Sequence, residues 1–330
     1  MAGAVGAQLF VPPVSMINTM NFASQKGFQP VLADSVFKPS PTWWRMTRLG
    51  RKITGASMVW GVLTTEENSG GAYWGVQNLD TSIVDPAQPA ELQWKAYYQN
   101  ISIPWQDIAL NSGPEQVIDL CKMKSEVAMG SLLQKLSRAI YGTSPNNTSL
   151  DLDSLPSAMA ASGTYANITI GTSNQWVCNG GAAHAPGAVT GPSTATGAVT
   201  LATMQNEYSL ATFGNEEPDT CITTQAVYNT FWGLVTANQR YLDDETTRAG
   251  FKMHMMFNNA VVLHDQFVPS GEMYMLTTKY TQPVFHQADY FKVWPFIMPT
   301  SQMVMSAKIT LQMNLQLLSL RQHSRHTNLS

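Results

Sequence analysis

The chain has 330 residues, enough for one large or two ordinary domains with a substantial core. Charged residues make up only 12% of it, about half the usual share, which fits either a subunit covered by neighbours or a surface rich in uncharged polar groups. The net charge of −3 argues against a dedicated nucleic-acid-binding domain, and the three scattered cysteines exclude a disulfide framework. No apolar run reaches the ~20 residues that cross a bilayer, so we expect a soluble protein of cytoplasmic origin.

The first 40 residues show no convincing period, and prolines break their short apolar runs. They are expected to form an arm that is ordered by whatever it lies on. Positive charge gathers over residues 26–52, which hold one acid, and negative charge over residues 207–245, which hold one base. Unless this is chance clustering, the two regions have different surroundings. The basic residues are Lys26, Lys38, Arg45, Arg48, Arg51 and Lys52.

A long two-stranded hairpin is predicted next. The composition turns β-like from Trp43, with one candidate strand at Ile53–Leu63 and another at Leu92–Ile103. In the second strand the apolar parity shifts after Tyr98, which indicates a bulge or a change of partner strand. The intervening Thr64–Ala90 is rich in Gly, Asn, Asp and Pro, so we expect it to be the hairpin tip. Before the shift, the apolar face holds Leu92, Trp94, Ala96 and Tyr98.

Ser112–Gly142 is predicted to be a long amphipathic helix. Pro114 suits its first turn, and Gly142 suits the left-handed residue just past its end. At 1.5 Å per residue the helix is about 42 Å long, enough to cross a compact subunit, although such helices are often ordinary scaffolding. One stripe is expected to be buried, and it comprises Val117, Cys121, Ala128, Leu132, Leu136 and Ala139.

Residues 154–206 contain no Asp, Glu, Lys or Arg. Their Gly, Ala, Ser and Thr suit short strands and turns in a peripheral elaboration, and a weakly ordered insertion is the alternative.

Residues 204–290 then look like a compact α/β unit. Thr223 or Thr224 can cap a helix with Val227, Phe231, Leu234 and Val235 on one face, and two strands, Asn259–His264 and Met273–Thr278, are joined by a turn at Pro269-Ser270-Gly271.

The clearest period in the sequence lies near its end. From Met303 to Leu317 apolar residues alternate with polar ones, and only Val304 breaks the polar set. A strand of this length spans roughly 50 Å, which matches the helix. Its methionine-rich face is expected to be core or interface.

No motif for catalysis or cofactor binding stands out. His323 and His326 have ligand-like spacing, but in a polar C-terminal tail we expect them to be solvated. The acids Asp243, Asp244 and Glu245 read as a solvated loop, and a hydrolase that uses them is the distant alternative. We therefore predict no catalytic, cofactor or metal site, and a protein that is not an enzyme.

The order of these elements resembles the major capsid proteins of tailed bacteriophages, the Hong Kong 97-type fold of the α+β class. The resemblance rests on Trp105-Gln106-Asp107 and Gly113-Pro114-Glu115 before the helix, and on two phrases of the α/β unit at residues 258–265 and 268–274. It implies an N-terminal arm at 1–42, an extended E-loop with flanking strands at 43–110, a P-domain spine helix at 111–145, an uncharged insertion at 146–203, an A domain at 204–290, a long P-domain strand at 291–320 and a tail at 321–330.

The resemblance also implies a function. Many copies assemble as hexamers and pentamers into an icosahedral head around double-stranded DNA, which is touched weakly and without sequence specificity. It implies a virion protein assembled in the cytoplasm of a bacterial host, with a separate scaffolding protein, a portal, possible decoration proteins and no membrane. An encapsulin-like compartment and a tail-tube protein are the alternatives. Expected interface residues are Tyr73, Trp74, Asp85, Leu132, Leu136, Arg45, Arg48 and Arg51.

Overall fold

The computed structural model describes residues 40–65, 70–79, 82–83, 85–110, 120–144, 150–171, 175–179, 191–238 and 255–329. By its contacts the chain divides into two compact units, and each is described by itself. Of the described residues, those within 40–98, 131–292 and 310–329 belong to the larger unit, and those within 99–130 and 293–309 belong to the smaller unit. None of the helices within the described ranges is both long and apolar enough to cross a bilayer.

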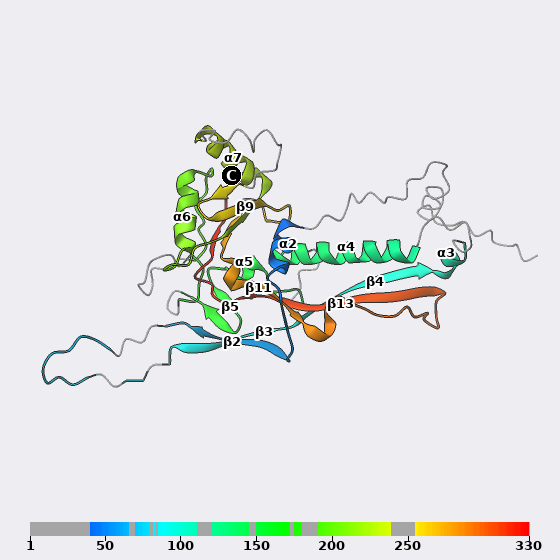
Figure 1. Cartoon of the computed structure of the whole chain (residues 1–330), viewed down its shortest axis with the longest axis horizontal. Helices are drawn as coiled ribbons and strands as arrows, with labels where there is room; N and C mark the ends of the chain where they lie inside the picture. Colours follow the sequence, from blue (N-terminus) through cyan, green and yellow to red (C-terminus); the bar gives the residue numbers. More distant parts are fainter. Residues whose placement is uncertain are drawn as a thin grey trace, which may run out of the picture. The chain divides into compact units, whose positions relative to one another are not determined.

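A five-stranded sheet forms the α/β part of the larger unit (Figure 1). Its strands are β7 (Thr220–Thr223), β8 (Met256–Phe257), β9 (Ala260–His264), β10 (Met273–Leu276) and β14 (Ser324–His326). Their order is β14-β10-β7-β9-β8, with β7 and β9 parallel and the other neighbours antiparallel. Helix α6 (Leu201–Ala211) contacts β14, and α7 (Gln225–Asn238) contacts β9, so helices and sheet share one apolar core.

The helix predicted after Thr223 or Thr224 is confirmed as α7. The Thr224 hydroxyl accepts a hydrogen bond from Val227 N at 3.5 Å, as a helix cap does, and Val227 and Phe231 are buried. The two predicted strands are present as β9 and β10, but they are not neighbours. β7 lies between them and pairs with both, so the turn at residues 269–271 carries the chain from one side of β7 to the other.

The second sheet is built on the long strand β13 (Val304–Leu317). β13 pairs antiparallel with β11 (Thr281–His286), whose other neighbour is the parallel edge strand β1 (Arg51–Ile53). Two further strands, β12 (Lys292–Val293) and β4 (Lys95–Pro104), also pair with β13. The predicted alternation is confirmed over residues 307–313, where every second residue is buried and the residues between them are not.

The two ends of the predicted alternation are wrong. Met303 is 66% exposed, and at the other end Asn314 and Gln316 are buried although they belong to the polar set. The reason at Asn314 is a second layer packed on this face of the strand. Its side chain accepts hydrogen bonds from Asp153 N (3.0 Å) and Leu315 N (2.8 Å), and it donates to Gln93 O (2.9 Å) and Asp153 Oδ2 (2.7 Å).

Strands β2 (Ser57–Leu63) and β3 (Ala87–Gln93) form the predicted hairpin and leave residues 64–86 as its connection. The two predicted strands around it are too long. The first is interrupted at Gly55, whose φ of +136° few side chains tolerate, so β1 and β2 join different sheets. The second is interrupted at Trp94, which places the predicted change of partner there, because β3 pairs with β2 whereas β4 pairs with β13.

The interruption at Trp94 also reverses the predicted parity of the next strand. Ala96 and Tyr98, expected on the apolar face, are exposed, and Tyr97 is half-buried instead. The Tyr97 hydroxyl donates a hydrogen bond to Asp151 Oδ1 at 3.2 Å and accepts one from Leu152 N at 2.7 Å. Burial raises the pKa of Tyr97 well above its usual value, so the hydroxyl stays neutral.

Helix α4 (Leu120–Ile140) confirms the predicted long helix from Leu120 onward, whereas residues 111–119 lie outside the described residues and Trp105–Leu110 forms a separate helix, α3. The predicted stop is confirmed as well. Gly142 has a φ of +65°, and Thr143 N donates a hydrogen bond to Arg138 O at 3.1 Å, the pattern of a glycine-terminated helix. Along the stripe the buried residues are Ala128, Leu132, Leu136 and Ala139.

A short helix, α2 (Pro41–Thr47), stands where β structure was predicted from Trp43, so that prediction is wrong. Pro41 takes a first-turn position, and the Ser40 hydroxyl caps the helix by accepting a hydrogen bond from Trp43 N at 3.3 Å. Trp43 is buried and meets Phe285 edge to face, with ring centroids 6.5 Å apart. The Trp43 ring thus packs α2 onto the core. Most of the predicted arm, residues 1–39, lies outside the described residues.

The uncharged tract forms short elements in its described parts, as predicted: α5 (Leu155–Ala158), β5 (Gly163–Tyr165) and β6 (Ile168–Ile170). These elements are not peripheral, however. Tyr165 is buried, and its hydroxyl donates a hydrogen bond to Leu315 O and accepts one from Leu317 N, both at 3.0 Å.

The prediction of a solvated C-terminal tail is wrong. His323 is fully buried, His326 is 4% exposed, and Leu329 belongs to the core cluster of the α/β part. Residues 324–326 form β14 and pair with β10, while Leu329 N donates a hydrogen bond to Gly271 O at 2.9 Å. The polar side chains of this segment find buried partners that lie far away in the sequence.

Replacing Gly271 by Ala is expected to destabilise the larger unit by about 2 kcal/mol. Gly271 has a φ of +74°, and a Cβ atom there would lie 2.7 Å from Leu329 O. The measurement is the thermal or chemical unfolding midpoint. Gly61→Ala is the matched control, because no atom lies within 4 Å of its Cβ position, and its midpoint should stay or rise slightly. An equal effect at both glycines would contradict the contact between Gly271 and Leu329.

Candidate assembly surfaces

The hairpin of β2 and β3 has two different faces. On the inner face Met58 and Leu92 are cross-strand partners, and both are buried. On the outer face Val59 is 63% exposed and Leu63 is 77% exposed. An isolated two-stranded ribbon is marginal in water, so this hairpin depends on what covers its faces.

The base of the hairpin is fixed to the larger unit. At the break between β3 and β4, Trp94 Nε1 donates a hydrogen bond to Gly55 O at 2.9 Å. The Trp94 ring also meets the His286 ring edge to face, with centroids 5.0 Å apart. On β3, Glu91 N donates to Ala166 O at 3.0 Å, which ties the hairpin to the β5–β6 turn. The two interruptions of the predicted strands therefore meet at one anchored point.

The hairpin connection carries large apolar side chains that the chain leaves uncovered. Tyr73 is 67% exposed and Trp74 is 88% exposed, and their place at an interface stays a prediction. Val76, Leu79 and Ile83 are each at least 60% exposed. Asp85, predicted at the same interface, instead accepts a hydrogen bond from Ala87 N at 3.3 Å and so stabilises the start of β3. Aromatic side chains exposed to this degree are typical of binding surfaces.

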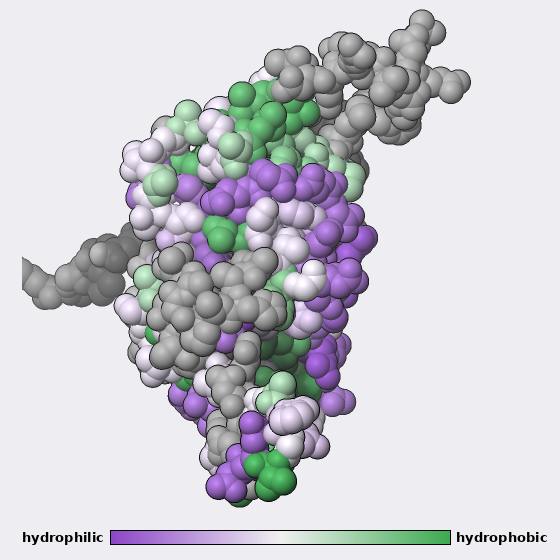
Figure 2. Space-filling view, turned by 90° about the vertical axis from the view of Figure 1, so that its left-hand side faces the viewer, coloured by the Kyte–Doolittle hydropathy of each residue, from purple (hydrophilic) through white to green (hydrophobic). Residues whose placement is uncertain are grey.

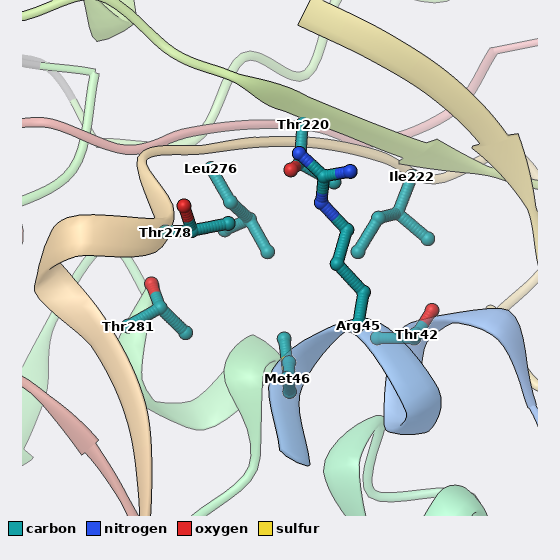
Figure 3. A pocket seen from close by; sticks show the side chains of 8 residues that line it. All are labelled: Thr42, Arg45, Met46, Thr220, Ile222, Leu276, Thr278 and Thr281. Atoms are coloured by element: carbon teal, nitrogen blue, oxygen red, sulfur yellow. The ribbon is translucent and has the colours of Figure 1, made fainter. Parts of the chain in front are cut away.

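The three arginines predicted at an interface have three different surroundings. Arg45 points from α2 toward β7, where Nη2 donates a hydrogen bond to Asp219 O at 3.2 Å (Figure 3). Arg48 is exposed and stacks on the Trp44 ring, with its guanidinium 3.8 Å from the ring centroid. Arg51 is exposed on the edge strand β1. Arg45 is half-buried and in part holds β7, and the assignment of the three arginines to an interface stays a prediction.

A small cavity beside Arg45 holds no more than about one water molecule, since its volume is near 10 Å³. It is lined by Thr42, Arg45, Met46, Thr220, Ile222, Leu276, Thr278 and Thr281 (Figure 3). Such a space is far smaller than a ligand pocket. Among the residues that the structure describes, no three His, Cys, Asp or Glu side chains gather as metal ligands do.

No protein-family model matches the chain, and no curated protein does. Solved structures match almost all of it. A chain of the cyanophage A-1(L) capsid asymmetric unit matches with a TM-score of 0.71 at 16% identity, covering 92% of this chain and 97% of that one. A chain of the Myoviridae phage XM1 capsid matches with a TM-score of 0.56 at 11% identity, covering 92% and 97%. A chain of the holo-SrpI encapsulin complex from Synechococcus elongatus PCC 7942 matches with 0.56 at 12% identity, covering 98% and 97%.

This chain has the phage-capsid fold. The predicted α+β class and Hong Kong 97-type architecture are thereby confirmed, whereas the domain boundaries stay a prediction. In this capsid fold, Leu132 and Leu136 of α4 are fully buried within the chain. They offer no surface to a neighbour, so their assignment to an interface is wrong. The stripe itself was expected to be buried, and its described residues are buried inside this chain.

The capsid fold also exposes apolar side chains that the sequence analysis missed. In the smaller unit the segment at residues 293–303 folds back on β13, where Trp294 N donates a hydrogen bond to Lys308 O at 2.9 Å. Within this segment Ile297 is 63% exposed, and Val293 and Met298 are exposed too. The apolar run at residues 293–298 could have indicated this exposed surface, but a run of this kind is equally typical of a buried core segment.

A further apolar region of the capsid fold lies on α7. Trp232 is 48% exposed there, and Leu234 and Val235 are half-buried. Figure 2 shows hydrophobic surface at the top of the view, where α7 lies in Figure 1, above a band of hydrophilic side chains. The larger unit thus presents separate apolar regions on the hairpin connection and on α7.

Proposed function

We propose that this chain is the major capsid protein of a tailed bacteriophage, which assembles as hexamers and pentamers into an icosahedral head around double-stranded DNA. The observation that carries the proposal is the anchored hairpin with its exposed connection, where Trp74 is 88% exposed. Its base is held by Trp94, which supports a connection that is available to a neighbouring subunit. The similarity to phage capsid chains, strongest for the cyanophage chain among the three above, supports the same role.

In this proposal the apolar connection of one subunit packs on the next subunit of the shell. Tyr73 and Trp74 supply the buried contact area, as aromatic residues do at protein interfaces. Arg48 and Arg51 are exposed and are assigned to weak contacts with phosphate or with the acids of a neighbour. A separate scaffolding protein, a portal and possible decoration proteins complete the proposed set of partners, and the mature protein resides in the virion.

An encapsulin-like compartment is the second candidate, because the encapsulin chain matches as well as the XM1 chain does, with a TM-score of 0.56 for each. The fold alone does not separate a DNA-filled head from a shell around a protein cargo. The cyanophage chain matches with a TM-score of 0.71, and that difference favours the phage head.

Negative-stain electron microscopy of the chain, coexpressed with its genomic neighbours, tests the proposal. We expect closed icosahedral particles, and particles isolated after infection should contain double-stranded DNA. Closed particles that enclose a protein and no DNA would favour the encapsulin-like compartment. Open tubes would favour the tail-tube alternative, and a monomer under all conditions would overturn the shell function.

A further inference from the structure

The C-terminal segment Arg321–Leu329, here named the C-terminal clasp, lies between two parts of the larger unit. On one side β14 pairs with β10. On the other side Ser193 N donates a hydrogen bond to Arg325 O at 2.9 Å, and Thr327 N donates to Ser193 O at 2.8 Å. The clasp therefore joins the end of the uncharged tract to the edge of the α/β sheet, and its removal would uncover both.

Arg325 is the main polar anchor of the clasp. Its guanidinium binds the Glu272 carboxylate in a two-point contact, with Nη2 2.7 Å from Oε1 and Nε 3.3 Å from Oε2. Nη1 donates a third hydrogen bond to Pro156 O at 3.0 Å. Both side chains are largely buried, with exposures of 14% and 12%. Removing either partner would leave the other charge buried and unpaired, which is strongly destabilising.

The surroundings of the His326 ring favour its charged form. Nε2 lies 2.9 Å from Ala195 O, a carbonyl that only accepts, and Nδ1 lies 2.9 Å from Glu207 Oε1. Both ring nitrogens thus face oxygen atoms, an arrangement that favours the ring with a proton on each nitrogen. Burial opposes that charge, but the hydrogen bonds with Glu207 and Ala195 outweigh it, so the pKa of His326 lies above its usual value.

The ring of His323, three residues earlier, is held in its neutral form. Thr277 N points at Nδ1 from 3.3 Å, and a backbone N–H only donates, so Nδ1 accepts. Nε2 then carries the proton and faces the Thr281 hydroxyl at 3.3 Å. A second proton on this ring would meet the Thr277 N–H and place a charge at a fully buried site.

We propose that the C-terminal clasp is an acid-released latch: it closes the edge of the α/β sheet while His323 is neutral, and it leaves β10 when His323 takes up a proton. Release would free the edge of β10 and the partner groups at residues 193–197 together, because both are paired to the same segment. The latch is a property of the subunit itself, and it does not rest on shell formation.

The charged groups around His323 are engaged with other partners. Arg325 binds Glu272, Asp219 binds Thr278, and Lys279 binds Glu216 at 2.5 Å. Arg321 donates to Gln175 and covers the Phe213 ring, and Glu217 accepts a hydrogen bond from Tyr208 at 2.9 Å. Within the described residues, both nitrogens of the His323 ring face threonines and not carboxylates. Protonation of the ring is therefore opposed by burial without a compensating counter-ion.

The sign of the pH effect follows from the two histidines. Burial lowers the pKa of His323 to about 3, whereas the released ring has the usual value near 6.5. His323 thus stabilises the closed clasp above about pH 6.5, and this contribution is lost as the pH falls toward 3. His326 has a raised pKa, so its contribution is complete below about pH 6.5 and is lost at higher pH. Acid release is therefore assigned to His323.

Hydrogen exchange of the purified full-length protein, read by mass spectrometry on peptides that cover residues 321–329, tests the latch. After correction for the intrinsic exchange rate at each pH, protection of the clasp should fall about tenfold per pH unit from pH ~6 to pH ~4.5. Peptides from α4 should keep their protection over the same range. Protection of the clasp that does not change with pH, or that falls in parallel with α4, would overturn the proposal.

Two variants separate His323 from the other groups of the clasp. His323→Asn keeps an acceptor for Thr277 N and does not titrate, so its clasp protection should be flat between pH ~6 and ~4.5. His326→Gln should lower the protection but keep the acid slope. Histidine ring nitrogen NMR on the unaltered protein gives a check that needs no variant: His323 should be neutral at pH 7. A charged His323 there, or a slope that persists in His323→Asn, would contradict the latch.

Discussion

Replacing Leu132 by Asp is expected to leave no folded subunit. Leu132 is fully buried on the stripe of α4. The substitution removes a core leucine, which alone costs about 2–5 kcal/mol, and places a carboxylate where it has no partner. Together these terms approach the whole stability of a typical domain, about 5–15 kcal/mol. The expected result is loss of soluble protein and of the cooperative unfolding transition in circular dichroism.

Val127→Asp is the control for this experiment. Val127 lies on the same helix and is 40% exposed, so an aspartate there stays in water and should change the free energy of unfolding by less than about 1 kcal/mol. The pair also separates folding from assembly, since a folded Val127→Asp subunit that forms no particles would place this face of α4 at an interface. A folded Leu132→Asp subunit would mean that the buried stripe is assigned wrongly.

Replacing residues 65–85 by Asn-Gly is expected to give a stable subunit that does not build particles. Thr64 N donates a hydrogen bond to Pro86 O at 3.0 Å, so a two-residue turn can close the hairpin directly after this pair. The buried inner-face residues Met58 and Leu92 remain, so the unfolding midpoint should not change. What is lost is the exposed apolar connection. Electron microscopy and analytical ultracentrifugation should therefore find subunits or small oligomers instead of shells.

A single substitution refines this experiment. Trp74→Ala should weaken each contact between subunits by about 2 kcal/mol, roughly 30-fold, which is typical of a central aromatic residue in an interface. Asn78→Ala in the same connection is the control and should assemble normally, because Asn78 is an exposed polar residue outside the apolar set. Normal particle yields from the Asn-Gly replacement would show that the hairpin tip is not an assembly contact.

The elements that the sequence predicted well are those whose signals are local. The stop of α4 at Gly142 depends on one glycine and the turn before it, and the period of β13 repeats from residue 307 to residue 313 without interruption. The hairpin connection could also be predicted, because turn-forming residues are concentrated between the two strands. These features require no knowledge of which distant segments come together.

The elements that were predicted wrongly depend on distant partners. α2 is pinned by the hydrogen bond from Ser40 to Asp265, and the clasp by the contact between His326 and Glu207, and both partners lie more than a hundred residues away. A polar residue in a terminal segment is predicted to be solvated unless its buried partner is known. The same limit applies to the interface residues, because Leu132 and Trp74 are both large and apolar, and only the tertiary structure shows that one is covered and the other exposed.

The order of strands in both sheets has a consequence for biosynthesis. Because β1 pairs with β11, residue 51 cannot pair until residue 284 has been synthesised. The outer edge of β10 is likewise unpaired until β14 at residues 324–326 has been synthesised. Pairing between strands that are distant in sequence slows folding. The ribosome adds about 5–20 residues per second, so the partner strands are synthesised many seconds apart. Neither five-stranded sheet can therefore be completed on the ribosome before its last strand has been made, which is β13 in one sheet and β14 in the other.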